Sequence, residues 1–291
     1  MSVEVDHAVI NVMTRMDAAV ERFRSLGFTL TERGFHSLGS INHLMMFGTD
    51  YLELVGIEPE AKKVRREVAD GPVGLNGLVI RTKDARALHA TLAAAAIPVL
   101  DAVDFDRPVA FEGRMQRAEF TTVRIDPGWL SGGRVYFCEH RTPQLVWQPQ
   151  WQHHDNGAVG LAAFTIVVPD PADEGGRYAR LLGCKPEMRR SDEVELDLGR
   201  FQLVLCTQAR YLERYGDCAS SRVNSAEAAF MGALSVRVAS MRRVRDCLAR
   251  PAAADVRWRT SGDPRHAVGG DDAGVTIAAS SAYDCALDFV A

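Results

Sequence analysis

Four short apolar segments recur along the chain, each followed within a few residues by a helical pattern of apolar positions. The segments are rich in β-branched residues, which is typical of buried strands. They span residues 7–12, 77–82, 163–168 and 233–238. The helices that follow are expected at residues 16–26, 85–95, 171–182 and 241–248. The chain is therefore predicted to repeat a strand-helix unit four times.

The spacing of these units indicates internal duplication. The final residues of the four strands are separated by 70, 86 and 70 positions. The first and third helices both end in a Leu-Gly pair, and their glycines, Gly27 and Gly183, stand 156 positions apart. Glycine suits a helix end because a positive φ costs it little. The offset of 70 occurs once in each half, and the halves are 156 positions apart. This spacing predicts a pair of modules that is itself repeated.

Short strands joined by glycine turns follow each helix. They are expected at 28–32, 41–47 and 51–56, then at 117–125, 133–139 and 144–147, then at 193–198 and 200–206, and finally at 274–279 and 285–290. Three strands with short turns form an antiparallel meander rather than a parallel crossover. The predicted fold class is α+β, with four tandem βαβββ modules that pair into two open, curved mixed β-sheet barrels with helices outside.

The modules pair into two expected domains. Residues 1–148 would form the first, from modules 1–58 and 72–147, and residues 157–291 the second, from modules 157–207 and 229–291. The concave face of one module has to be buried against its neighbour, so each pair would enclose a pocket.

The composition argues against several classes of function but does not point to one. The net charge of −4 gives no reason to expect binding to nucleic acid or to an anionic membrane. No apolar run approaches the roughly 20 residues that span a bilayer. The six cysteines are far apart, which fits free thiols in the cytoplasm. No glycine-rich phosphate-binding motif occurs, so a nucleotide cofactor is not expected.

The chain resembles the glyoxalase-like branch of the vicinal oxygen chelate superfamily. The resemblance rests on the strand around His7, the helix ending Leu26-Gly-Phe28 and the segment Gly48-Thr-Asp-Tyr-Leu-Glu53-Leu-Val. It covers the whole chain by topology and the first 58 residues by sequence pattern. The superfamily includes isomerases, lyases, dioxygenases and drug-binding resistance proteins, so the fold alone does not give a function.

The resemblance implies a metal ligand on the first strand and another on the last strand of a module. In the first half these positions give His7, Glu53 and Glu139 as metal ligands, with Glu53 and Glu139 also as the catalytic carboxylates. The first-strand position of the second module holds Gly77, which cannot be a ligand. In the second half the corresponding positions hold Ala163, Ala233, Gln202 and Asp288. A metal site is therefore expected only in the first half, with the second half as support or as a homodimer surface.

Strand alternation gives the orientation of these residues. Glu53 should face the pocket if Leu52 and Leu54 face the helix. One of Asn42 and His43 should also face it, and a one-residue slip would exchange Glu139 for His140. Arg81 is expected on the pocket side, where a guanidinium can hold a substrate carboxylate. We therefore take Arg81, Asn42 and His43 as candidate substrate-binding residues.

Three functions remain open at this point. The favoured one is a metal-dependent lyase or isomerase acting on a small oxygenated substrate, with zinc, iron, manganese or nickel held by imidazole and carboxylate groups. The second is a non-catalytic protein that binds a small molecule, as bleomycin-resistance proteins do. The third, an extradiol-type dioxygenase, is disfavoured because the second histidine ligand is replaced by Gly77.

Overall fold

The computed structural model describes residues 3–261 and 273–291. The first half contains β1 (Val5–Met13), α1 (Met16–Ser25), β2 (Gly34–Phe35), β3 (Ile41–Met46) and β4 (Tyr51–Gly56), then, after the short α2 (Arg66–Ala69), β5 (Gly74–Arg81), α3 (Ala85–Ala94), β6 (Val103–Phe111), β7 (Arg114–Arg124) and β8 (Arg134–His140). The second half contains β9 (Ala158–Val167), α4 (Pro171–Leu182), β10 (Pro186–Arg190), β11 (Glu193–Asp197) and β12 (Gln202–Cys206), then, after α5 (Gln208–Tyr215), β13 (Phe230–Val238), α6 (Met241–Leu248), β14 (Trp258–Thr260), β15 (Val275–Ile277) and β16 (Ala286–Val290).

The predicted fold of four βαβββ modules is confirmed. Each half forms one curved eight-stranded mixed sheet, ordered β2-β3-β4-β1-β5-β8-β7-β6 in the first half and β10-β11-β12-β9-β13-β16-β15-β14 in the second. The first strands of the paired modules lie antiparallel at the centre of each sheet, β1 beside β5 and β9 beside β13. Part of the fourth module, residues 262–272, lies outside the described residues.

One expected strand of the second module is wrong. Residues 143–145 form a short 3-10 turn instead, which Pro143 begins, and the first strand of the meander is β6, over residues 103–111. Pro108 argues against a strand in a sequence reading, because proline lacks the N–H group that a ladder needs. Proline is tolerated here because β6 is the edge strand of its sheet.

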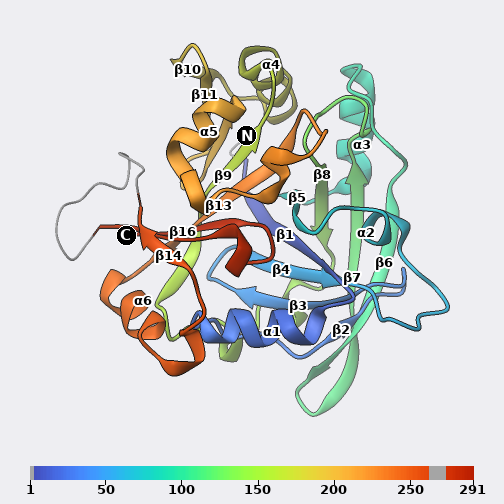
Figure 1. The fold of residues 1–291 in the computed structure, drawn as a ribbon. Coiled ribbons are helices and arrows are strands. Elements are labelled where there is room, and N and C mark those ends of the chain that lie inside the picture. Colours follow the sequence, from blue (N-terminus) through green and yellow to red (C-terminus); the bar gives the residue numbers. More distant parts are fainter. Residues whose placement is uncertain (1–2, 262–272) are drawn as a thin grey trace.

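The two sheets share one hydrophobic core. It is built from side chains on the helix-facing sides of both sheets, among them Ile10, Leu54 and Leu78 of the first half with Phe164 and Leu234 of the second. Strand β13 lies against β5, so the halves pack through their central strands (Figure 1). Within the described residues no helix has the length and apolar character needed to cross a bilayer. The residues of the candidate sites lie on the opposite faces of the two sheets.

Candidate functional site

A β-bulge in β1 positions the centre of the site. The pairing of β1 with β5 shifts between Val5, opposite Ile80, and His7, opposite Val79, so Asp6 is the extra residue. A bulge re-aims side chains locally. Successive residues of a regular strand point to opposite faces. Because of the bulge the Asp6 and His7 side chains contact each other instead, with Asp6 Oδ2 lying 2.7 Å from His7 Nδ1.

Asp6 is a fully buried carboxylate with three charged or polar partners. Its Oδ2 also lies 2.8 Å from His140 Nε2, and its Oδ1 accepts from Arg81 Nε at 2.9 Å. Burial acts to raise the pKa of Asp6, but the charges and hydrogen bonds of His140 and His7 outweigh burial and hold this pKa well below its usual range. The ionised carboxylate can only accept, so His7 Nδ1 donates to it and Nε2 is the ring nitrogen that faces the cavity.

Glu53 faces His7 Nε2 from β4. Its Oε2 lies 3.5 Å from His7 Nε2, and its Oε1 accepts from Asn42 Nδ2 at 2.7 Å. Leu52 and Leu54 point into the shared core, so Glu53 lies on the opposite face of the strand as the alternation predicts. Burial acts to raise the pKa of Glu53, but His7, His36 and the Asn42 amide hold it below its ordinary value.

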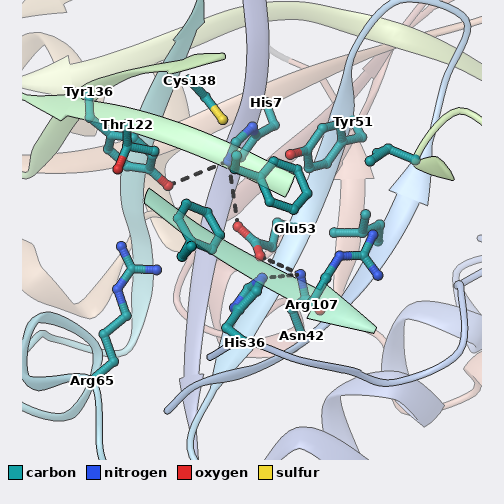
Figure 2. A pocket seen from close by; sticks show the side chains of 14 residues that line it. His7, His36, Asn42, Tyr51, Glu53, Arg65, Arg107, Thr122, Tyr136 and Cys138 are labelled. Atoms are coloured by element: carbon teal, nitrogen blue, oxygen red, sulfur yellow. Dashed lines mark hydrogen bonds and ion pairs between the residues drawn. The ribbon is translucent and has the colours of Figure 1, made fainter. Parts of the chain in front are cut away.

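Figure 2 shows how aromatic groups complete the surroundings of His7. The Tyr51 ring stacks on the imidazole with the ring centroids 4.3 Å apart, and Tyr136 Oη lies 3.4 Å from His7 Nε2. These groups border a cavity of about 20 Å³, which is room for about one water molecule. The other residues that line the cavity are His36, Asn42, Leu44, Glu53, Arg65, Phe105, Arg107, Phe120, Thr122, Cys138 and Val146.

The wall opposite His7 is cationic and polar. Arg107, from β6, is buried, and burial lowers the pKa of its guanidinium. Arg65 has an Nε atom with no hydrogen-bond partner among the described residues, with Glu67 Oε2 3.8 Å away, and Asn42 Oδ1 is likewise unpartnered there. Burial lowers the pKa of His36 to about 3, so this imidazole is neutral at physiological pH. Two guanidinium groups thus face a cavity that contains one carboxylate.

The structure brings only some of the predicted site residues together. His7, Glu53 and Asn42 line the cavity, whereas His43 points to the other face of β3, where its Nδ1 is 2.7 Å from Thr31 O. Arg81 lies on the expected face but is held by Asp6, and its guanidinium stacks over Trp147 at 4.6 Å. Arg81 instead lines a separate groove of about 490 Å³ beside Glu139 and His140.

Glu139 lies outside the cavity, contrary to expectation. Its Oε2 accepts from Ala85 N at 2.8 Å at the start of α3, where a carboxylate stabilises the N-terminal end of the helix. Of the two residues left open, His140 is the one that turns toward Asp6. Strand alternation explains the result, because Tyr136, Cys138 and His140 share the pocket face of β8 and Glu139 faces the helix.

The pairing registers identify the true counterpart of Glu53. His7 lies opposite Tyr51 in the β1–β4 pair, and Gly77 lies opposite Arg134 in the β5–β8 pair. Two residues further along β4 is Glu53, and two residues further along β8 is Tyr136. The second module therefore presents a phenol where the first presents a carboxylate.

Five residues of the site are not among the candidates that the sequence gives: Asp6, His36, Arg65, Arg107 and Tyr136. Tyr136 could have been found by applying the offset of 70 to the first strands and then counting along the paired last strands. Asp6 carries no such signal, because strict alternation places it on the face opposite His7.

A second group of possible ligands lies at the edge of the cavity. Asp6, Cys138 and His140 have ligand atoms within 4.8 Å of one another. Burial raises the pKa of the Cys138 thiol well above its usual value, so this sulfur is protonated at neutral pH. Asp6 Oδ2 already contacts both imidazoles. This group therefore suits a supporting role for His7 better than direct metal binding.

The paired βαβββ modules, with His7 and Glu53 on the first and last strands of one module, define a protein of the vicinal oxygen chelate class. A family model described as a glyoxalase-like domain matches residues 5–182. The chain therefore belongs to the glyoxalase-like domain family. A search of curated proteins found no match.

Solved structures share the fold at low sequence identity. A hypothetical protein from Staphylococcus aureus is 10% identical with a TM-score of 0.64, over 81% of this chain and 92% of that chain. A mutant of 4-hydroxymandelate synthase from Streptomyces coelicolor is 12% identical with a TM-score of 0.54, over 99% of this chain and 92% of that one. A mutant of homoprotocatechuate 2,3-dioxygenase from Brevibacterium fuscum is 13% identical with a TM-score of 0.56, over 99% and 71%.

Proposed function

We propose that this protein is a divalent-metal-dependent enzyme of the lyase or isomerase type that moves a proton on a small, anionic, oxygenated substrate. The observation that supports it is the placement of His7 Nε2, which lies 3.5 Å from Glu53 Oε2 and 3.4 Å from Tyr136 Oη. Both distances are longer than the donor–acceptor distance of a good hydrogen bond. Ligand atoms bonded to one ion at about 2.0 to 2.2 Å lie within about 4 Å of each other, so these three atoms could hold a common ion.

The donor set fits such an ion chemically. His7 offers a ring nitrogen held in place by Asp6, Glu53 has a pKa below its ordinary value, and Tyr136 adds an oxygen donor. Nitrogen and oxygen ligands suit zinc, iron(II), manganese and nickel. When bound, the ion would polarise vicinal oxygen atoms of the substrate. With Gly77 in the remaining position, the site leaves coordination positions open.

The other residues of the cavity have separate roles in this proposal. The hydrogen bond from Asn42 fixes the Glu53 carboxylate, which accepts the proton. Arg107 and Arg65 bind the anionic group of the substrate, because no other cations line the cavity among the described residues. The small volume of the cavity means that side chains move when the substrate enters.

A second candidate is a non-catalytic binding module. The observation favouring it is the stacked pair Phe105 and Phe120, with centroids 4.9 Å apart, which gives the cavity an aromatic wall beside Leu44 and Val146. A dioxygenase is supported less well, since the names of structural neighbours concern those proteins and Gly77 supplies no ligand here.

The test is the metal content of wild-type protein and two site variants. Protein stripped with a chelator is loaded with zinc, iron(II), manganese or nickel, and bound metal is measured by elemental analysis. We expect about one equivalent in the wild type and its loss in both His7→Ala and Glu53→Gln. Tyr136→Phe should bind more weakly than the wild type because it removes one oxygen donor.

Glu139→Gln is the matched control. It makes the same carboxylate-to-amide change on a residue that contacts α3 instead of the cavity, and it should retain the full equivalent. Equal loss of metal in this variant would contradict the assigned site. Wild-type protein that binds none of the four metals would overturn the metal-dependent proposal and leave the binding module.

A further inference from the structure

The second half has a large pocket whose charge differs sharply from that of the chain. Its volume is about 550 Å³, within the range of small-molecule sites. The chain carries a net charge of −4, yet six arginines line this pocket against two glutamates. Its lining residues come from β9 to β13, α5 and the end of β16, elements that Figure 1 labels. The charged residues of the lining are Arg189, Arg190, Glu193, Glu195, Arg200, Arg210, Arg214 and Arg237.

Arg237 is the second-half counterpart of Arg81. The β9–β13 pairing shifts between Leu161, opposite Val236, and Ala163, opposite Ser235, so the extra residue is Ala162. The same bulge in the first half contains Asp6. The repeat therefore places an alanine where the first half has the carboxylate that binds Arg81.

The loss of that carboxylate leaves Arg237 with backbone contacts. Its guanidinium donates to Arg200 O at 2.6 Å and to Leu161 O at 3.4 Å. Within residues 3–261 and 273–291, neither Arg200 nor Arg237 has a carboxylate within ion-pair distance. Burial and the charge of Arg200 lower the pKa of Arg237, and Asp50 offsets them only in part.

The remaining carboxylates of the pocket are already engaged. Glu193 Oε2 contacts Arg210 Nε at 3.1 Å and Arg214 Nη2 at 2.6 Å, so one buried carboxylate serves two guanidiniums of α5. Glu195 Oε2 contacts Arg189 Nε at 2.7 Å. These contacts leave Arg200 and Arg237 as guanidiniums of the lining that neither glutamate pairs.

We propose that this pocket binds a small ligand through a phosphate or carboxylate group, which takes the place beside Arg237 that Asp6 occupies beside Arg81. A guanidinium can donate two parallel hydrogen bonds to either kind of oxyanion. Arg200, an exposed residue of the lining, adds positive charge to the pocket. The site is separate from the first-half cavity and does not depend on the proposed function.

Isothermal titration with inorganic phosphate, pyrophosphate and citrate tests this site in the full chain. The wild type should bind pyrophosphate, citrate or both. The stronger ligand shows whether phosphate or carboxylate is the natural group. Arg237→Gln should weaken binding about tenfold or more, as expected for the loss of a charge-assisted hydrogen bond. Ala162→Asp should do the same without removing any arginine, because it restores the carboxylate of the first half.

Arg242→Gln is the matched control, since Arg242 lies on α6 and its side chain is 87% exposed. It should bind as the wild type does. No binding of any of the three anions, or equal weakening in the control, would overturn the proposal. The proposal would also be overturned if the Ala162→Asp variant melted at the wild-type temperature and bound these anions with unchanged affinity. Metal binding at the first site should not change in either pocket variant, which separates this test from that of the proposed function.

Discussion

The two halves of the molecule share topology and a central bulge, but they differ in the residues that line the pocket faces of their sheets. The first-strand position holds His7 in one half and Ala163 in the other, and the register of β12 with β9 puts Val204 at the position of Glu53. The strand-pairing scaffold is thus independent of the chemistry placed on it. A duplicated half can lose a site without losing its fold.

The connection between modules decides what fills each half. In the first half, residues 57–73 connect β4 to β5 and contribute Arg65 to the cavity wall. In the second half, the corresponding connection forms α5, whose Tyr211 and Tyr215 are fully buried. Tyr215 Oη donates to Asp288 Oδ2 at 3.1 Å, and Asp288 is the counterpart of Tyr136. Helix α5 therefore fills the space that is the cavity of the first half.

The largest expected effect concerns this helix. Tyr211 is buried, its Oη donates to Gly232 O at 2.9 Å, and it accepts from Ser220 N at 3.0 Å. Tyr211→Ala should lower the free energy of unfolding by about 3 to 5 kcal/mol, as removal of a buried aromatic side chain does. Urea denaturation measures the change. Tyr211→Phe should lower the free energy of unfolding by about 1 kcal/mol, because it removes the hydrogen bonds of the hydroxyl group.

Arg65→Ala is the comparison in the first half. It removes a wall of a cavity rather than a filled core, so it should cost clearly less than Tyr211→Ala. Equal costs would mean that the two connections do the same structural work, and the contrast between the halves would fail.

The second prediction concerns the bulge residue. Asp6→Asn keeps the shape of the side chain but removes the anion that orients His7. Metal affinity should fall about 10- to 100-fold, as for loss of a carboxylate behind a histidine ligand. Competition with a chromophoric chelator measures it. If Asp6 were merely structural, the variant would melt earlier and still bind metal with wild-type affinity, and that result would contradict its positioning role.

The sequence predicts the scaffold better than the site, and particular residues explain why. Helix bounds and module order follow from apolar periodicity and from repeat offsets, which depend on many residues at once. Glu53 is placed correctly because Leu52 and Leu54 fix the faces of β4. Asp6 is not, because a bulge breaks the alternation on which such reasoning depends.

Glu139 and Arg107 show two further limits. Glu139 matches Glu53 in residue type, but the β5–β8 register puts Tyr136 at the position of Glu53, and Glu139 contacts the start of α3. Arg107 lies in an edge strand that contains a proline, and the local sequence therefore argues against a strand there. Both errors come from tertiary pairing, which a single sequence does not display.

The third prediction concerns a contact between the halves. Asp50 Oδ1 accepts from Leu161 N at 2.8 Å, and burial raises the pKa of Asp50 to about 6. The folded pKa exceeds the unfolded value of 3.8, so its contribution to stability is present below about pH 4 and is lost as pH rises through 6.

Asp50→Asn keeps the acceptor oxygen and cannot ionise. Relative to the wild type, the variant should therefore gain roughly 1 to 3 kcal/mol between pH 4 and pH 8. Urea denaturation across this pH range measures the gain. Asp104→Asn is a control of opposite sign, since the hydrogen bond from Thr121 lowers the pKa of Asp104. A pH-independent difference for Asp50→Asn would refute the linkage.

The smallest expected effect compares the two glycines that end equivalent helices. Gly183 ends α4 with φ of 65°, and an added Cβ would meet no atom within 4 Å. Gly183→Ala should therefore cost only the positive φ, about 1 kcal/mol. Gly27 has φ of 85°, but its Cβ would lie 2.6 Å from Cys247 Sγ and 2.9 Å from Asn156 N.

Gly27→Ala should cost at least about 1 kcal/mol more than Gly183→Ala, because it combines backbone strain with overpacking against the second half. Urea denaturation of the two variants gives the difference directly. Equal losses of unfolding free energy would show that the residues packed against Gly27 move aside at little cost. The two helix ends would then tolerate an added Cβ equally well. A larger cost at Gly27 would show that the same Leu-Gly signal serves a helix end in one half and an interface in the other.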